Sequence, residues 1–179
     1  MDGAPGQAEV VAAIEAAFAD VEPPPHWCLA NSVEGVEPAA LTREFAEVPD
    51  WRGLTPEFMD ATPDGFGSAL SFFSDEAFRY YLPAFVIATV HDQLTRADPV
   101  FHLTHGLDDS SSLEALNSRR YGARTWRDYA LFRFSVFSRA QAGAIALFLR
   151  QQRTVPNRVD LERQRITQAL EAYWSRRER

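Results

Sequence analysis

Two histidines and two aspartates lie close together in the sequence and form the set best suited to hold a metal ion. His102 and His105 are three residues apart, and Asp108 and Asp109 follow them. Histidines one helical turn apart can bind the same metal ion, and carboxylates can complete the coordination shell of that ion. A metal-dependent, hydrolase-like enzyme using His102, His105 and Asp108 is therefore one hypothesis. The H-x-x-H spacing lacks the internal glutamate of a metalloprotease helix, so we favour structural roles at a helix end and a solvated turn.

Arg79, Tyr80 and Tyr81 lie just before Pro83 and are the candidate binding residues. Inside a helix, proline removes its own N–H donor and frees the carbonyl group of Arg79. A freed carbonyl group and polar side-chain tips beside aromatic surface are also features of binding clefts. Because tyrosine hydroxyls commonly satisfy such backbone groups inside a fold, we favour the structural role over binding.

Motifs for nucleophilic or phosphate-binding chemistry do not occur in the sequence. Cys28 is the sole cysteine and follows His26 by two residues, but its position between tryptophan and leucine is typical of a small buried residue. The sequence contains no glycine-flanked serine elbow and no G-x-x-x-x-G-K or G-x-G-x-x-G run. We therefore assign no catalytic residue and expect no cofactor.

The helix that would position the binding candidates is predicted over residues 75–96. Ser74 is a good N-cap, and the acidic side chains of Asp75 and Glu76 complement the positive end of the helix dipole. Pro83 predicts a kink or a break, because its ring clashes with the preceding turn and disfavours helical geometry at Leu82. Apolar residues cover most of the circumference, so both halves should be buried.

Start and stop signals predict further helices on either side of this one. They cover residues 7–21, 38–48, 55–60 and 98–106, one or two turns after Ser111, a helix that begins at the Ser138–Gln141 capping box, and a final helix after residue 157. Residues 117–125 are predicted as exposed loop. Residues 126–137 fit both a strand and a helix face, and we favour extended structure.

Length and composition are those of an ordinary globular protein. The chain has 179 residues, of which 46% are hydrophobic and 24% charged. We expect one domain over residues 1–179, with a disordered leader over residues 1–6. The predicted fold class is mainly α, with helices gathered around the segment that contains Pro83 and room for one small β element.

Charge and hydropathy bear on the partners of the protein. A formal net charge of −7 opposes binding to a phosphate backbone, so we expect no nucleic-acid partner. No stretch approaches the roughly 20 apolar residues of a membrane-spanning helix. The single cysteine fits a reducing compartment. We expect a soluble, cytoplasmic protein without a membrane partner.

Four segments of the chain are distinctive: Trp51, A-L-S-F-F-S-D-E-A-F-R-Y-Y-L-P-A-F at 69–85, S-R-A-Q-A-G-A-I-A-L-F-L at 138–149 and A-L-E-A-Y-W at 169–174. In these segments the chain resembles a bacterial family catalogued as a domain of unknown function, with the core motif A-L-S-F-F-S-x-E-A-F-R-Y-Y-L-P-A. The resemblance implies one compact domain and supplies no catalytic residues.

Two classes of function are therefore compatible with the sequence. The favoured class is a non-enzymatic protein that binds a protein partner or a small molecule, because the chain carries no catalytic motif. The alternative is the metal-dependent enzyme using His102, His105 and Asp108. The pattern of residues does not fix the partner, the substrate or the oligomeric state.

Overall fold

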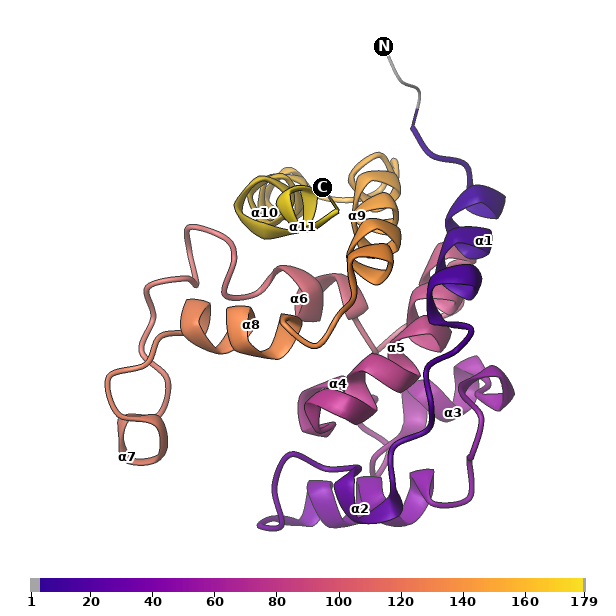
Figure 1. Ribbon diagram of the computed structural model, residues 1–179, viewed down its shortest axis with the longest axis vertical. Helices are drawn as coiled ribbons and strands as arrows, with labels where there is room; N and C mark the ends of the chain where they lie inside the picture. Colours follow the sequence, from indigo (N-terminus) through magenta and orange to yellow (C-terminus); the bar gives the residue numbers. More distant parts are fainter. Residues whose placement is uncertain (1–3, 179) are drawn as a thin grey trace. The chain divides into compact units, whose positions relative to one another are not determined.

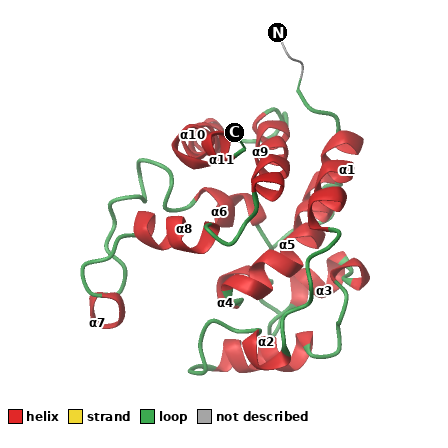
Figure 2. Cartoon of the chain, viewed as in Figure 1, coloured by secondary structure: helices red, strands yellow, loops and turns green. Residues whose placement is uncertain are grey.

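The computed structural model describes residues 4–178, except for the side chain of Arg120. The predicted fold class is confirmed, because helices joined by loops make up this part of the chain (Figure 2). The two β-bridges found in the described residues are isolated, one between Ala30 and Phe73 and one between Ala115 and Thr125. Residues 1–3 of the expected leader lie outside the described residues. No helix in the described part is both long enough and apolar enough to cross a bilayer.

The contacts of the chain divide it into two compact units. We call residues 14–99 the central unit, and residues 1–13 together with 100–179 the C-terminal unit. Each unit is described by itself below. The expectation of a single domain stays a prediction.

The central unit contains the end of the first helix and six further helical segments, of which α2, α3, α4 and α5 are labelled in Figure 1. They are α1 (Gln7–Phe18), η1 (His26–Cys28), α2 (Val36–Phe45), η2 (Trp51–Gly53), α3 (Pro56–Ala61), α4 (Ala69–Phe72) and α5 (Asp75–Val90). The predicted Ser74 cap is confirmed, because its hydroxyl accepts from the N–H of Ala77. The Thr55 hydroxyl caps the helix predicted to begin at residue 55 in the same way, by accepting from the N–H of Phe58. Local capping chemistry therefore sets the starts of α3 and α5.

Helix α5 continues through Pro83, so the predicted break does not occur there, and the predicted kink stays a prediction. Proline costs a helix about 3 kcal/mol or more. Phe78, Leu82 and Phe85 are completely buried, and their burial offsets that cost. The helix ends at Val90 rather than near Arg96.

The turn after α5 is held by the carboxylate of Asp60 in α3. Its oxygens accept hydrogen bonds from the backbone N–H groups of Thr95, Arg96 and Ala97 at 2.7–2.9 Å. The Thr95 hydroxyl donates a further bond at 2.7 Å. These bonds satisfy donors that a longer α5 would have used internally. The helix itself ends because Asp92 adopts a left-handed φ of 56°, and the N–H of Gln93 then bonds back to the carbonyl oxygen of Ala88 at 2.9 Å.

The C-terminal unit contains the remaining helices. They are α6 (Pro99–Thr104), α7 (Ser118–Tyr121), α8 (Trp126–Phe134), α9 (Arg139–Arg153), α10 (Asp160–Ala169), the π-helical segment η3 (Leu170–Trp174) and α11 (Ser175–Arg177). Trp174 is fully buried at the centre, where its ring lies 4.8 Å from that of Phe134 and 5.9 Å from that of Phe137. Its indole N–H donates to the carbonyl oxygen of Leu103 at 2.8 Å.

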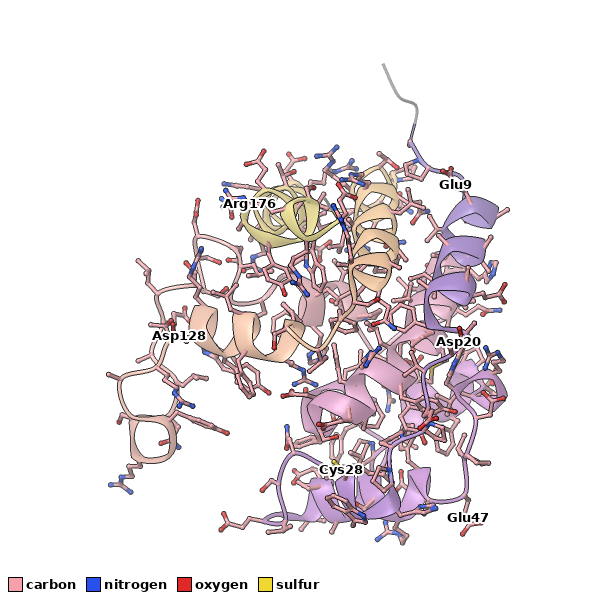
Figure 3. All side chains as sticks on the ribbon, viewed as in Figure 1. Glu9, Asp20, Cys28, Glu47, Asp128 and Arg176 are labelled. Carbon is pink, nitrogen blue, oxygen red and sulfur yellow. The ribbon has the colours of Figure 1, made fainter. Side chains whose placement is uncertain are left out.

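Extended structure was the wrong prediction for residues 126–137, because Trp126–Phe134 forms α8. Thr125 and Asp128 make a reciprocal capping box that starts the helix, with Asp128 at its N-terminal end (Figure 3). The apolar alternation does not follow burial, since Phe132 is exposed and Phe134 is buried. The predicted loop before this helix contains the short, exposed α7, and the predicted helical turns after Ser111 are hydrogen-bonded turns instead.

Candidate functional site

A pocket with a cavity volume of about 270 Å³ lies in the central unit beside the second half of α5. Its walls come from four helices and the loops next to them. The lining residues are Glu15, Trp51, Arg52, Leu54, Pro56, Met59, Ala84, Ile87 and Ala88. Seven of the nine side chains are apolar, which is the usual character of a small-molecule site.

Helix α5 makes one wall of the pocket with residues that share a face. Ala84, Ile87 and Ala88 are spaced at i, i+3 and i+4 and therefore lie side by side. Elsewhere this helix carries large buried side chains such as Phe78 and Phe85. The two alanine methyl groups are too small to fill the same space, and the cavity lies against them.

Trp51 and Arg52, which belong to η2, form another part of the lining besides the wall from α5. The carboxylate of Asp50 starts this turn by accepting from the N–H of Arg52 at 3.0 Å, and it also pairs with the Arg52 guanidinium at 3.4 Å. The guanidinium carbon lies 4.4 Å from the centroid of the Trp51 ring. Trp51 is only 3% exposed, and its Nε1 has no hydrogen-bond partner among the described residues.

Tyr80 and Tyr81 hold the backbone segment that leads into η2. The Tyr80 hydroxyl donates to the carbonyl oxygen of Pro49, and the Tyr81 hydroxyl donates to that of Val48, both at 2.8 Å. Burial raises the pKa of Tyr80, and it raises the pKa of Tyr81 to about 12. Both hydroxyls therefore keep their protons at neutral pH and act as donors.

None of the three candidate binding residues lines the pocket. Tyr80 precedes Ala84 by one helical turn on the same face of α5, so it adjoins the wall. Arg79 is half-buried. Because the hydroxyls of Tyr80 and Tyr81 are bonded to backbone, the geometry gives these two residues a positioning role. A direct binding role for the three residues stays a prediction.

In the C-terminal unit, His102 lies on α6 and His105 lies in the turn directly after it, within aromatic surroundings. The His105 ring stacks on Phe101 at 4.8 Å between centroids and meets the Trp126 ring edge-on at 4.6 Å. Burial lowers the pKa of His102 to about 3, helped by the positive charge of Arg133. Burial also lowers the pKa of His105. Both rings are therefore neutral at pH 7.

Asp108 is buried and accepts hydrogen bonds from the two serines that follow it. The donors are the N–H of Ser110 at 3.0 Å, the N–H of Ser111 at 3.1 Å, the Ser111 hydroxyl at 2.6 Å and the Ser110 hydroxyl. Burial alone would raise the pKa of this carboxyl, but these bonds lower it below its ordinary value. In the described part of the chain, no three His, Cys, Asp or Glu side chains are grouped to hold a metal ion. The hydrogen bonds within this turn therefore explain why the Asp108 carboxylate can be buried there.

Cys28 does not form a catalytic pair with His26 in the described geometry. Its Sγ lies 3.6 Å from a carboxylate oxygen of Glu76 and 3.9 Å from the Ser74 hydroxyl. Burial raises the pKa of the thiol, and the negative charge of Glu76 adds to that effect. The thiol is therefore less reactive than an ordinary cysteine.

Sequence reasoning missed the pocket because its residues come from segments up to 73 positions apart, from Glu15 to Ala88. Trp51 was singled out only as a distinctive residue. The available signal was the pair Ala84 and Ala88, two small residues four positions apart on a helix that also carries large side chains such as Phe78 and Phe85. Such a pair leaves a hollow only if the facing segment does not fill it.

Comparison with known proteins identifies a family for this chain but no individual related protein. Neither the curated proteins nor the solved structures contain a match to this chain. A family model described as a family of unknown function (DUF6714) matches residues 6–178, which is nearly the whole sequence. The chain therefore belongs to the DUF6714 family.

Proposed function

We propose that this protein binds a small, mostly apolar molecule in the pocket beside Trp51. The observation that carries the proposal is the cavity of about 270 Å³, with its apolar walls and a few polar groups. Ligand sites usually measure roughly 300–1,000 Å³, so this pocket suits a ligand smaller than a typical drug.

The polar groups at the pocket favour a ligand that carries a neutral hydrogen-bond acceptor. The Trp51 indole N–H is a buried donor without a partner, which costs roughly 1–3 kcal/mol until an acceptor satisfies it. The guanidinium of Arg52 offers further donors. Asp50 already pairs with Arg52, and Glu15 places a carboxylate in the lining, so an anionic ligand would be disfavoured. A carbonyl or amide oxygen on an apolar body fits best.

A matched series of small molecules tests this proposal. Phenylacetamide, phenylacetate and phenethylamine share an apolar body and differ in charge, and their binding can be measured by ligand-observed NMR. We expect the amide to bind most tightly. The variant Ala88→Leu, which fills the cavity, should weaken binding at least about tenfold, or about 1.4 kcal/mol.

The control is Ala39→Leu, at an exposed position of α2 away from the pocket. It should bind the amide as the wild type does. Equal binding of the amide to the wild type and Ala88→Leu would contradict the proposal, and so would binding of none of the three compounds.

We infer that this binding takes place in the cytoplasm of a bacterium. The single, half-buried cysteine and the resemblance to a bacterial family support this setting. The metal-dependent alternative has no geometric observation in its favour among residues 4–178. Small-molecule binding is therefore the function that we propose.

A further inference from the structure

Charge is divided unevenly between the two units. Residues 14–99 carry fifteen acidic side chains and four arginines, for a net charge of −11. Residues 1–13 and 100–179 together carry ten acidic side chains and fourteen arginines, for a net charge of +4. Opposite charges segregated in this way steer association with a complementary surface.

Basic side chains gather on a protruding segment of the C-terminal unit, residues 113–127, which we call the arm. Its base is closed by the bridge between Ala115 and Thr125 and by the bond from the N–H of Leu116 to the carbonyl oxygen of Arg124 at 2.9 Å. Figure 1 shows α7 at the tip of the arm, beyond the N-terminal end of α8. The arm is therefore a closed loop, and most of its described side chains are exposed, although Leu116 is buried.

The surface of the arm combines positive charge with apolar area. Arg119, Arg124 and Arg127 are exposed. Leu113 is 82% exposed, and Tyr121 is also exposed. Guanidinium groups pair with carboxylates through two parallel hydrogen bonds, and exposed apolar side chains beside them favour a partner that also has apolar area.

The central unit carries a surface with the opposite charge and a similar apolar content. It lies on the connection from residue 22 to residue 37, which we call the acidic connection. Trp27 is 86% exposed, and Val33 and Val36 are also exposed. Glu22 and Glu34 are exposed on the same connection. The acidic connection therefore offers both carboxylates and apolar side chains to an arginine-rich partner.

We propose that the arm of one chain docks on the acidic connection of a second copy. Each copy has one arm and one acidic connection, so the contact is heterologous and can extend to further copies or close into a ring. The charge complementarity of the two surfaces supports this partner. A nucleic acid fits less well, because the attached central unit, at −11, repels a polyanion.

Sedimentation of the full chain at two salt concentrations is the first test. At about 0.02 M NaCl the average mass should rise with protein concentration, and at about 0.5 M it should fall toward that of a monomer because salt screens the contact. A mass that stays monomeric at every concentration in low salt would overturn the proposal.

Charge reversal identifies the surfaces. The double variant Arg119→Glu, Arg124→Glu should weaken association at least about tenfold at low salt. The matched control Arg153→Glu, Arg176→Glu changes the net charge equally at exposed positions outside the arm and should leave association within about twofold of the wild type. Circular dichroism would confirm that both variants fold. An equal loss in the control would overturn the proposal.

A charge swap gives the sharpest outcome. The variant Glu22→Arg, Glu34→Arg should also fail to associate by itself. Mixed with the arm variant it should associate again, since each reversed surface then meets its opposite. If the mixture stays dissociated, the two surfaces are not partners. If the arm variant instead loses binding to a single-stranded RNA oligonucleotide while its self-association is unchanged, the partner is nucleic acid and the proposal is wrong.

Discussion

At the scale of single residues, the most informative side chains of the central unit are those that satisfy distant backbone groups. Tyr80 and Tyr81 were selected from the sequence as binding candidates, and their hydroxyls instead hold the carbonyl groups of residues 48 and 49. This places the Trp51 turn where it can line the pocket. Their expected contribution is to stability and to the shape of the site.

Removing the Tyr81 hydroxyl should destabilise the protein. The variant Tyr81→Phe leaves the partly buried carbonyl group of Val48 without this donor, which costs about 0.5–1.5 kcal/mol. The free energy of unfolding in urea measures the loss. Tyr121→Phe is the matched control, because Tyr121 is exposed, and it should change that free energy by less than about 0.5 kcal/mol. Equal stability of the two variants would contradict the assigned role.

Asp60 should make the stability of the protein depend on pH. Burial alone would raise the pKa of its carboxyl, but the hydrogen bonds from residues 95–97 lower it from 3.8 to about 2. Because the folded pKa lies below the unfolded one, the stabilisation is present above pH 3.8 and is lost as the pH falls toward 2.

The variant Asp60→Asn isolates this effect from other carboxylates. In urea unfolding the wild type should be the more stable protein at neutral pH, and the difference should shrink as the pH falls below about 4. A difference that stays constant between neutral pH and pH 3 would show that the lowered pKa of Asp60 does not contribute.

At the scale of elements, α5 combines a buried, close-packed half with a wall of small residues. Ala77 and Ala88 lie on this one helix and are almost equally buried, but only Ala88 lines the cavity. The same substitution at the two positions should therefore have opposite consequences. This contrast tests the cavity without any ligand.

Ala88→Leu should leave the free energy of unfolding unchanged or raise it by about 1 kcal/mol, because the added carbons fill empty apolar space. Ala77→Leu should lower it by about 1–3 kcal/mol, because no space is available at that fully buried position. Chemical denaturation of both variants measures the contrast. Equal destabilisation would mean that the wall beside Ala88 is already filled.

At the scale of the whole molecule, the binding proposal predicts a coupling between ligand and thermal stability. A ligand that binds only the folded state at about one hundred times its Kd adds about 2.7 kcal/mol. For a chain of this length, that corresponds to a rise of roughly 5–10 °C in the Tm of the transition that includes the central unit. Calorimetry with the neutral amide should show the rise in the wild type, and Ala88→Leu should show none at the same concentration.

The helices were predictable where their signals are local. Thr55, Ser74 and Ser138 cap helices that begin where the sequence predicts, since a hydroxyl and the N–H three residues later meet within a single turn. Apolar periodicity also predicted a mainly α fold. These signals need no knowledge of the rest of the chain.

The outcome at Pro83 and over residues 126–134 depended on tertiary packing. Burial around α5 offsets the cost of the proline, and the apolar alternation after Trp126 had no neighbouring strand to bond with among the described residues. Residues 126–134 form a helix because the capping box of Thr125 needs only nearby residues, whereas a strand needs a second strand to bond with.

By itself the sequence determined the helices whose start signals are local, such as those that begin after Thr55, Ser74 and Ser138, because such signals act over a few residues. Only the tertiary structure decided what those helices enclose. The partners of Tyr80 and Tyr81 lie more than thirty positions away, and the pocket exists because a turn at Trp51 faces two alanines from α5. Side-chain packing across such separations depends on the whole fold, and no short pattern records it.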